Sequence, residues 1–138
     1  MSTQEERDQW ALNNARTFVW HELYTPNKDE AMRFYKEALD FGTEEMPMGD
    51  MGMYPMLTRN GMGVAGVWDT TANKHMKDVP PHWAVYVSVD DVDARLTKCE
   101  SMGAKIVVPA MDVPTVGRMA LIRDPLGAHI WLFKSEST

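Results

Sequence analysis

The chain has 138 residues, of which 44% are hydrophobic and 25% are charged, a balance typical of one compact globular domain and not of a disordered segment or a fibre. No apolar run reaches the roughly 18 residues that cross a bilayer, and the first residues lack the basic and then apolar pattern of an export signal. We therefore expect a cytoplasmic protein without a membrane partner. The formal net charge of −6 also disfavours nucleic acid as a partner, because phosphates are neutralised by surfaces rich in Lys and Arg.

The first half of the chain reads as one strand, one helix and three further strands. A β-branched and aromatic run at 18–25 is typical of a strand, and a helix follows that Asn27 can cap and that Gly42 is expected to end. The Asn60-Gly61 pair predicts a tight hairpin turn. The three later strands are expected near 43–48, 54–59 and 62–69.

The same order of elements recurs in the second half. A strand at 83–89 precedes a helix that Asp90 can cap and that Gly103 ends. The strands after this helix are expected near 105–108, 118–123 and 128–133. The repeat predicts a polar N-terminal extension followed by a single domain of two linked modules. The boundaries are 1–16 for the extension, 17–138 for the domain, 17–69 and 82–134 for the modules, and 70–81 for the linker.

A helix over one face of a four-stranded sheet leaves the other face uncovered. Two modules can solve this by forming one curved sheet whose concave side is a pocket. We therefore predict an α+β fold in which tandem βαβββ modules form a curved mixed sheet, or cup, with the helices on its outer face.

Three motifs add a family resemblance to this topology: Phe34-Tyr35 in the first helix, the run 89–94, and the run 124–128 before the last strand. Together with the repeat they resemble the vicinal oxygen chelate superfamily, which holds glyoxalase I, extradiol dioxygenases and bleomycin resistance proteins. A narrower likeness, to bacterial glyoxalase-like proteins often described as hydroxylases, rests on Val19-Trp20-His21-Glu22-Leu23, on Trp83 with Tyr86, and on the segment 112–118.

The resemblance implies where a metal would bind. In metal-dependent members the ligands, typically His or Glu, come from the first and last strands of each module. Aligned on the shared motifs, three of these positions hold Trp20, Ala84 and Trp131, and the fourth lies within 62–67, which has no His, Asp, Glu or Cys. Indole and methyl groups do not ligate divalent ions, so we expect the family's metal site to be absent and no cofactor to be bound.

A displaced metal site is the alternative. Strand alternation points Glu22, His82 and His129 the same way as the three aligned positions, one step along the pocket. These residues are therefore candidate ligands only for a displaced site. The alternative is that these three residues bind no metal and form hydrogen bonds at the rim of the pocket.

Aromatic side chains replace the lost ligands. Trp20 and Trp131 occupy two of the aligned positions, and Tyr86 should point the same way, which favours a flat apolar ligand or a cation held over ring faces. The alternative is that these rings fill the cup and leave no cavity. The predicted ligand-binding residues are Trp20, Glu22, Met53, Trp83, Tyr86, Arg118, His129 and Trp131.

Other candidate residues carry less chemistry. Six of the 12 Met lie between 46 and 62, where they form either an adaptable hydrophobic wall or a dimer contact, or simply fill the core and occupy loops. Arg118 follows Gly117 and is a better ligand contact than Arg123. Cys99 lies on the apolar stripe of the second helix and is expected in the core.

These observations leave three hypotheses. The leading one is a metal-free small-molecule-binding protein, similar to glyoxalase and bleomycin resistance proteins, that sequesters a hydrophobic or cationic aromatic compound. The second is an enzyme of the same fold, a lyase, isomerase or hydroxylase, with Glu22 or His129 as general base or metal ligand. The third is a filled cup that serves only assembly. A homodimer is expected in each case, since relatives pair and sheet edges need covering.

Overall fold

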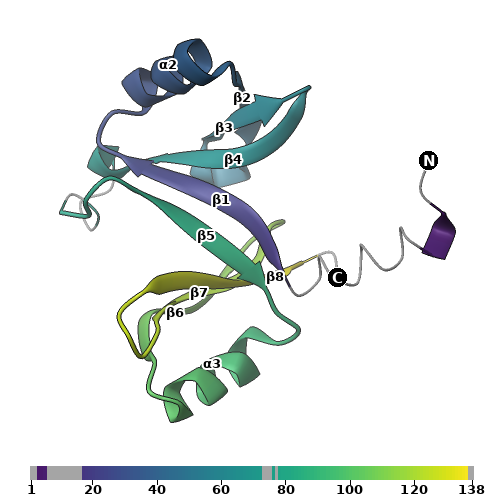
Figure 1. Ribbon diagram of the computed structural model, residues 1–138, viewed down its shortest axis with the longest axis vertical. Coiled ribbons are helices and arrows are strands. Elements are labelled where there is room, and N and C mark those ends of the chain that lie inside the picture. The colour runs from purple at the N-terminus through teal and green to yellow at the C-terminus, as the bar shows by residue number, and fades with distance from the viewer. Residues whose placement is uncertain (1–2, 6–16, 73–75, 77, 137–138) are drawn as a thin grey trace. The chain divides into compact units, whose positions relative to one another are not determined.

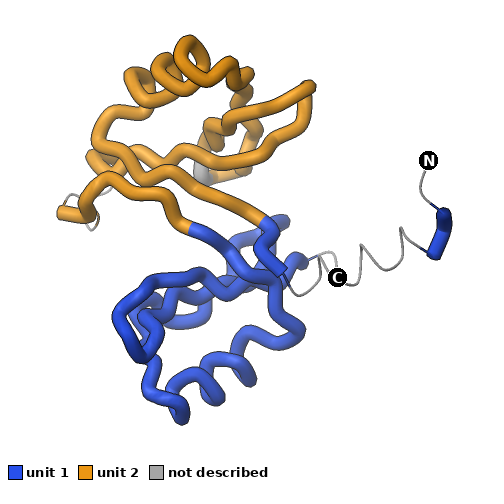
Figure 2. The backbone as a smooth tube through the Cα atoms, in the orientation of Figure 1, with its two compact units in different colours: residues 1–19, 85–138 blue, residues 20–84 orange. Residues whose placement is uncertain are grey.

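The structure is a computed structural model, and it describes residues 3–5, 17–72, 76 and 78–136 (Figure 1). Most of the predicted extension 1–16 and part of the predicted linker therefore lie outside the described residues. The chain divides into two compact units, unit 2 with residues 20–84 and unit 1 with residues 1–19 and 85–138 (Figure 2).

The first five regular elements follow the predicted order of one strand, one helix and three strands. The sheet order is β2-β3-β4-β1, in which β1 and β4 run parallel and the other neighbours antiparallel. The bounds are β1 (Phe18–Thr25), α2 (Lys28–Leu39), β2 (Gly42–Pro47), β3 (Met53–Arg59) and β4 (Met62–Asp69), with short 3-10 turns η1 (Gly49–Met51) and η2 (Thr70–Ala72).

The second set of elements repeats this topology. Its sheet order is β5-β8-β7-β6, again with one parallel pair, β5 with β8. The bounds are β5 (His82–Ser88), α3 (Val92–Ser101), β6 (Lys105–Val113), β7 (Gly117–Arg123) and β8 (His129–Ser135). The predicted α+β class and the tandem βαβββ arrangement are confirmed. The domain boundaries stay predictions.

Each unit has its own small core between helix and sheet. In unit 2 the buried side chains are Leu23, Leu57, Ala65 and Val67, against which Ala31, Met32, Tyr35 and Phe41 pack. In unit 1 they are Val92, Leu96, Ala120, Ile122 and Leu132, and Cys99 packs against them as predicted. Because strand side chains alternate, the neighbours of these core residues point to the sheet face opposite the helix.

Several predicted boundaries are confirmed and others are wrong. Asn27 caps α2 and accepts a hydrogen bond from the Glu30 amide at 3.0 Å, and Asn60 and Gly61 form the hairpin turn with positive φ angles of 55° and 80°. Asp91, and not Asp90, caps α3 through the Ala94 amide.

Two other boundaries differ as well. Helix α2 ends at Leu39, and its C-cap Asp40 has a left-handed φ of 61°, so that Gly42 already begins β2. Strand β6 continues to Val113, beyond the predicted end at 108, because it pairs with β7 across two register shifts. Among the described residues, no helix has the length and apolar character needed to span a membrane.

Candidate functional site on the sheet face opposite α2

Four side chains from β1 and β3 meet on the face of the unit 2 sheet opposite α2. The Glu22 side chain is at their centre and is only 7% exposed. Its Oε1 accepts a hydrogen bond from the Tyr24 hydroxyl at 3.0 Å, and its Oε2 accepts one from the Tyr54 hydroxyl. The Trp20 indole N–H donates to the Tyr54 oxygen at 3.0 Å. We call Trp20, Glu22, Tyr24 and Tyr54 the Glu22 cluster.

Strand alternation and one glycine place these groups. Trp20, Glu22 and Tyr24 are every second residue of β1, so they share a face while Leu23 enters the core. In the parallel pairing of β1 with β4, Glu22 lies opposite Gly66. A Cβ built on Gly66 would overlap the Tyr54 hydroxyl. The missing side chain at Gly66 therefore lets the Tyr54 ring cross β4 and reach the carboxylate.

The hydroxyl of Tyr54 is held in its protonated state. Burial is the main cause that raises the pKa of Tyr54 far above its usual value, and the neighbouring Glu22 carboxylate adds to it. Tyr54 consequently acts as a hydrogen-bond donor to Glu22 at any physiological pH. The cluster is a buried carboxylate oriented by two phenol donors and bordered by an indole, a geometry suited either to a cation or to a proton.

Two more aromatic residues border the cluster. The His82 ring stacks on Tyr24 with centroids 4.9 Å apart and an interplanar angle of 12°. Trp68 lies opposite Tyr24 in the β1–β4 pairing, and its buried indole N–H has no hydrogen-bond partner among the described residues. The face thus carries an apolar surface around one carboxylate.

The unit 1 sheet carries a second aromatic group on the face opposite α3. Tyr86 and Trp131 are register partners of β5 and β8, and their rings stack at 5.3 Å with an angle of 9°. Phe133 meets Tyr86 edge to face at 6.5 Å. His129 begins β8 and is exposed. Tyr86 and Trp131 are thus brought together as ring partners, while the binding role of all three predicted residues stays a prediction.

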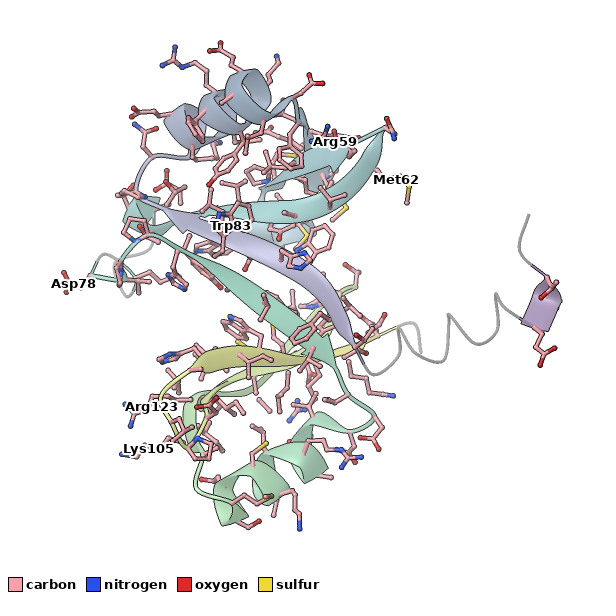
Figure 3. The ribbon with its side chains drawn as sticks, viewed as in Figure 1. Arg59, Met62, Asp78, Trp83, Lys105 and Arg123 are labelled. Atoms are coloured by element: carbon pink, nitrogen blue, oxygen red, sulfur yellow. The ribbon has the colours of Figure 1, made fainter. Side chains whose placement is uncertain are left out.

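Three predicted ligand contacts lie elsewhere. Trp83 is on the α2 side, where its indole N–H donates to the Tyr35 hydroxyl at 3.1 Å, so it does not share a face with Trp20 and Glu22 (Figure 3). Met53 is half exposed at the start of β3. Arg118 forms ion pairs with Asp93 of α3 at 2.8 Å and with Asp112 at 3.1 Å, which direct its guanidinium to the helix side. The Asp93 carboxylate raises the pKa of Arg118 further above its usual range.

The methionines of the first half are mostly at the surface. Met46, Met53 and Met62 are exposed, and Met62 projects at the β3–β4 hairpin (Figure 3). Met56 is half-buried, and its sulfur and the Trp20 ring both lie near Gly63. Of these four, Met56 is the one that shares a neighbour, Gly63, with a ring of the Glu22 cluster.

Metal ligands do not gather in the described part of the chain. Across residues 3–5, 17–72, 76 and 78–136, no three His, Cys, Asp or Glu side chains are placed to hold a metal ion. The displaced site of Glu22, His82 and His129 stays a prediction, because His129 belongs to unit 1 and the other two residues to unit 2. That the protein binds no metal stays a prediction.

The family model described as "Glyoxalase/Bleomycin resistance protein/Dioxygenase superfamily" matches residues 17–132. The chain belongs to this superfamily. The resemblance to the vicinal oxygen chelate superfamily is thereby confirmed. The match covers the first βαβββ repeat of this glyoxalase-superfamily protein and the second as far as the middle of β8.

Two curated relatives share sequence with this glyoxalase-superfamily protein. A Mycobacterium tuberculosis protein named "Putative glyoxylase CFP32" is 35% identical over 118 residues, which are 85% of this chain and 45% of the relative. The anthracycline biosynthesis protein DnrV of Streptomyces peucetius is 28% identical over 125 residues, which are 80% of this chain and 44% of the relative. The chain thus spans about half the length of the curated relatives it matches.

Solved structures show the same fold. Methylmalonyl-CoA epimerase from Mycobacterium tuberculosis aligns with a TM-score of 0.58 at 18% identity, covering 86% of this chain and 87% of the epimerase. A variant of the epimerase from Streptomyces coelicolor aligns with a TM-score of 0.62 at 15% identity, covering 89% of this chain and 97% of the epimerase. At these identities the likeness concerns the fold alone.

Proposed function

We propose that this protein binds a small aromatic compound, hydrophobic or cationic, with the Glu22 cluster as the polar centre of its site. The observation that carries the proposal is a carboxylate, 7% exposed, held by two tyrosine hydroxyls and bordered by an indole. Ring faces and a buried carboxylate both attract cations, and low solvent exposure strengthens that attraction. One relative is named for the biosynthesis of anthracyclines, which are aromatic compounds.

A cationic probe and its neutral counterpart test this proposal. We expect aminoacridine, cationic at slightly alkaline pH, to bind about tenfold more tightly than neutral acridine in isothermal titration calorimetry. Glu22→Gln should remove this preference, whereas Glu44→Gln, a matched change on the exposed strand β2, should retain it. Equal affinity for the two probes in the unchanged protein would contradict the role of Glu22.

The second sheet face calls for a separate variant. Trp131 stacks on Tyr86, so Trp131→Ala removes half of that ring pair. A loss of aminoacridine affinity in Trp131→Ala, with circular dichroism unchanged, would show that the Tyr86–Trp131 pair takes part in binding. Unchanged affinity would show that this ring pair takes no part in it.

A second candidate is an enzyme in which Glu22 is a general base. It is favoured by the burial and orientation of the carboxylate, and structural neighbours are described as epimerases, which move a proton. His129 is the other candidate base and is exposed. Incubation with methylmalonyl-CoA in heavy water, followed by NMR, detects exchange of the proton next to the carbonyl group. Exchange that is lost in Glu22→Gln supports this candidate, and its absence in the unchanged protein removes it for this substrate.

Three further expectations belong to the proposal: a homodimer, a cytoplasmic location and a site that works without metal. Sedimentation analysis tests the first and cell fractionation the second. For the third, metal analysis of tag-free protein should find no stoichiometric transition metal.

A further inference from the structure

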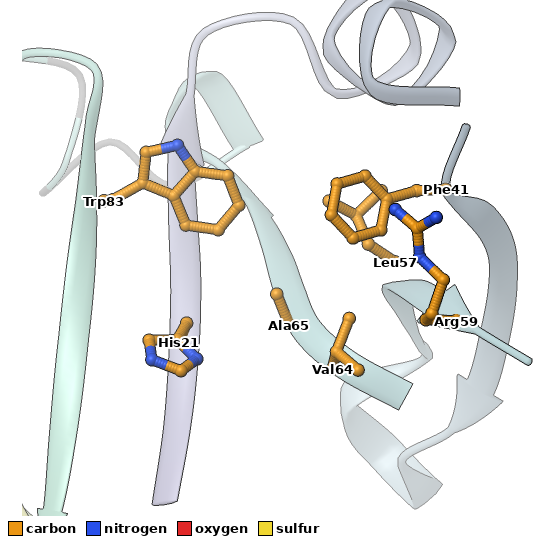
Figure 4. Close-up of a pocket in the computed structure, with 7 residues that line it drawn as sticks. All are labelled: His21, Phe41, Leu57, Arg59, Val64, Ala65 and Trp83. Carbon is orange, nitrogen blue, oxygen red and sulfur yellow. The ribbon is translucent and has the colours of Figure 1, made fainter. Parts of the chain in front are cut away.

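A hollow lies on the face of the unit 2 sheet opposite the Glu22 cluster, the side that α2 covers (Figure 4). Its volume is about 520 Å³, within the range of pockets that hold small ligands. We call it the α2-side pocket. Its lining residues are His21, Phe41, Leu57, Arg59, Val64, Ala65 and Trp83.

The pocket has an aromatic residue on each side. Figure 4 shows the Trp83 and Phe41 rings on opposite sides, with Ala65 between them. Leu57 and Ala65 form an apolar floor and are almost fully buried, whereas Trp83 is 44% exposed. The Trp83 ring is fixed by its hydrogen bond to Tyr35 and by an edge-to-face contact at 5.5 Å with the same ring. Such walls suit a flat apolar group.

The pocket is also lined by the guanidinium of Arg59, for which one hydrogen bond is seen. The Arg59 guanidinium lies 4.4 Å from the centroid of the Phe41 ring, and one of its N–H groups donates to the Leu39 carbonyl at 3.1 Å. A guanidinium has about five N–H donors, and within the described ranges Arg59 forms no ion pair. In a chain of net charge −6, Arg59 is thus a cation that lies beside an apolar hollow and has no carboxylate partner in the described part of the chain.

We propose that the α2-side pocket binds a planar aromatic carboxylate. The ring lies between Trp83 and Phe41, and the carboxylate accepts hydrogen bonds from Arg59. A guanidinium matches a carboxylate in shape and forms short, charge-assisted hydrogen bonds with it. This ligand is an anion, whereas the compound proposed for the Glu22 cluster is hydrophobic or cationic, and the two sites are on opposite faces of the unit 2 sheet.

Naphthoate and its uncharged counterpart naphthamide are the probes. In isothermal titration calorimetry we expect naphthoate to bind saturably and naphthamide about tenfold or more weakly. Arg59→Met, which keeps an apolar stem, should weaken naphthoate binding by a similar factor. Arg123→Met, a matched change at the end of β7 in unit 1, should not (Figure 3).

Arg59 also holds the C-terminal end of α2, so stability is measured alongside binding. If Arg59→Met does not fold, Arg59→Lys keeps the charge without the planar fork and should retain part of the preference for naphthoate over naphthamide. A shift of the Trp83 indole resonance in NMR on adding naphthoate would locate the ligand.

Three outcomes overturn the proposal: no saturable naphthoate binding, equal affinity for naphthamide, or unchanged affinity in Arg59→Met. Competition separates this site from the Glu22 cluster. Naphthoate affinity that is unchanged in the presence of saturating aminoacridine supports two independent sites, and full competition contradicts the α2-side location.

Discussion

Tyr54→Phe isolates the hydroxyl on which the Glu22 cluster depends. The change removes a hydrogen bond to a carboxylate that is 7% exposed, a type of bond worth about 1.5–3 kcal/mol. It also takes away the acceptor of the half-buried Trp20 N–H, at about 1 kcal/mol. The ring volume is unchanged and no cavity forms, so we expect the free energy of unfolding to fall by about 2–4 kcal/mol.

Urea denaturation followed by far-ultraviolet circular dichroism measures this loss. Tyr24→Phe is the matched control, because it removes one hydrogen bond to the other Glu22 oxygen and should cost less. A double-mutant cycle of Tyr54→Phe with Glu22→Gln should give a coupling energy above about 1 kcal/mol. Additive effects, or a loss in Tyr54→Phe below about 0.5 kcal/mol, would refute the reasoning, since a buried charged hydrogen bond cannot be that weak.

Other predictions use the same measurements. Gly66→Ala should destabilise by at least about 1–3 kcal/mol, and more than Gly63→Ala, since the new Cβ meets the Tyr54 ring and not a flexible Met side chain. The raised pKa of Tyr54 means that the unfolded chain loses its proton first, so stability should fall above about pH 10, and less so in Tyr54→Phe. The Arg95 side chain lowers the pKa of exposed Asp90 to about 2. The resulting stabilisation is present above about pH 4 and is lost as the pH falls through about 2, so Asp90→Asn should flatten this acid transition. A full equivalent of zinc, nickel, manganese or iron in tag-free protein would contradict the expected metal-free state.

The fold was predictable because local signals and the repeat agree. Asn27 caps α2 because an extended backbone at the cap lets its side chain reach the first turn of the helix. Asn60 and Gly61 form the β3–β4 hairpin turn because both residues tolerate a positive φ. The cap of α3 is harder to predict, since Asp90 and Asp91 are adjacent and either residue can cap a helix, and in the structure Asp91 accepts the hydrogen bond from the Ala94 amide. Asp90 turns outward to Arg95.

The candidate site was predictable only in part. Alternation along β1 places Glu22 with Trp20, and the same rule applied two residues on would have found Tyr24. Tyr54 is 32 residues from Glu22, and its position depends on strand pairing and on the space above Gly66, which no spacing rule encodes. Trp83 is predicted as a ligand contact together with Trp20, but its neighbour Ala84 is the residue that aligns with Trp20, and alternation along the strand then puts Trp83 on the other face, where it donates to Tyr35.

The stability of α2 against local opening determines how much of the time the α2-side pocket is formed. Helix α2 has no fully buried residue, whereas α3 buries Val92 and Leu96. The amide protons of α2 should therefore exchange with solvent through smaller and more frequent openings than those of α3. Arg59 donates to the carbonyl of Leu39, the last residue of α2, and Phe41 is the second residue after the helix. Each opening of α2 therefore removes one wall of the pocket. Occupancy of the pocket and protection of the α2 amides are then two measures of one equilibrium, and a ligand that binds there should slow hydrogen exchange in α2.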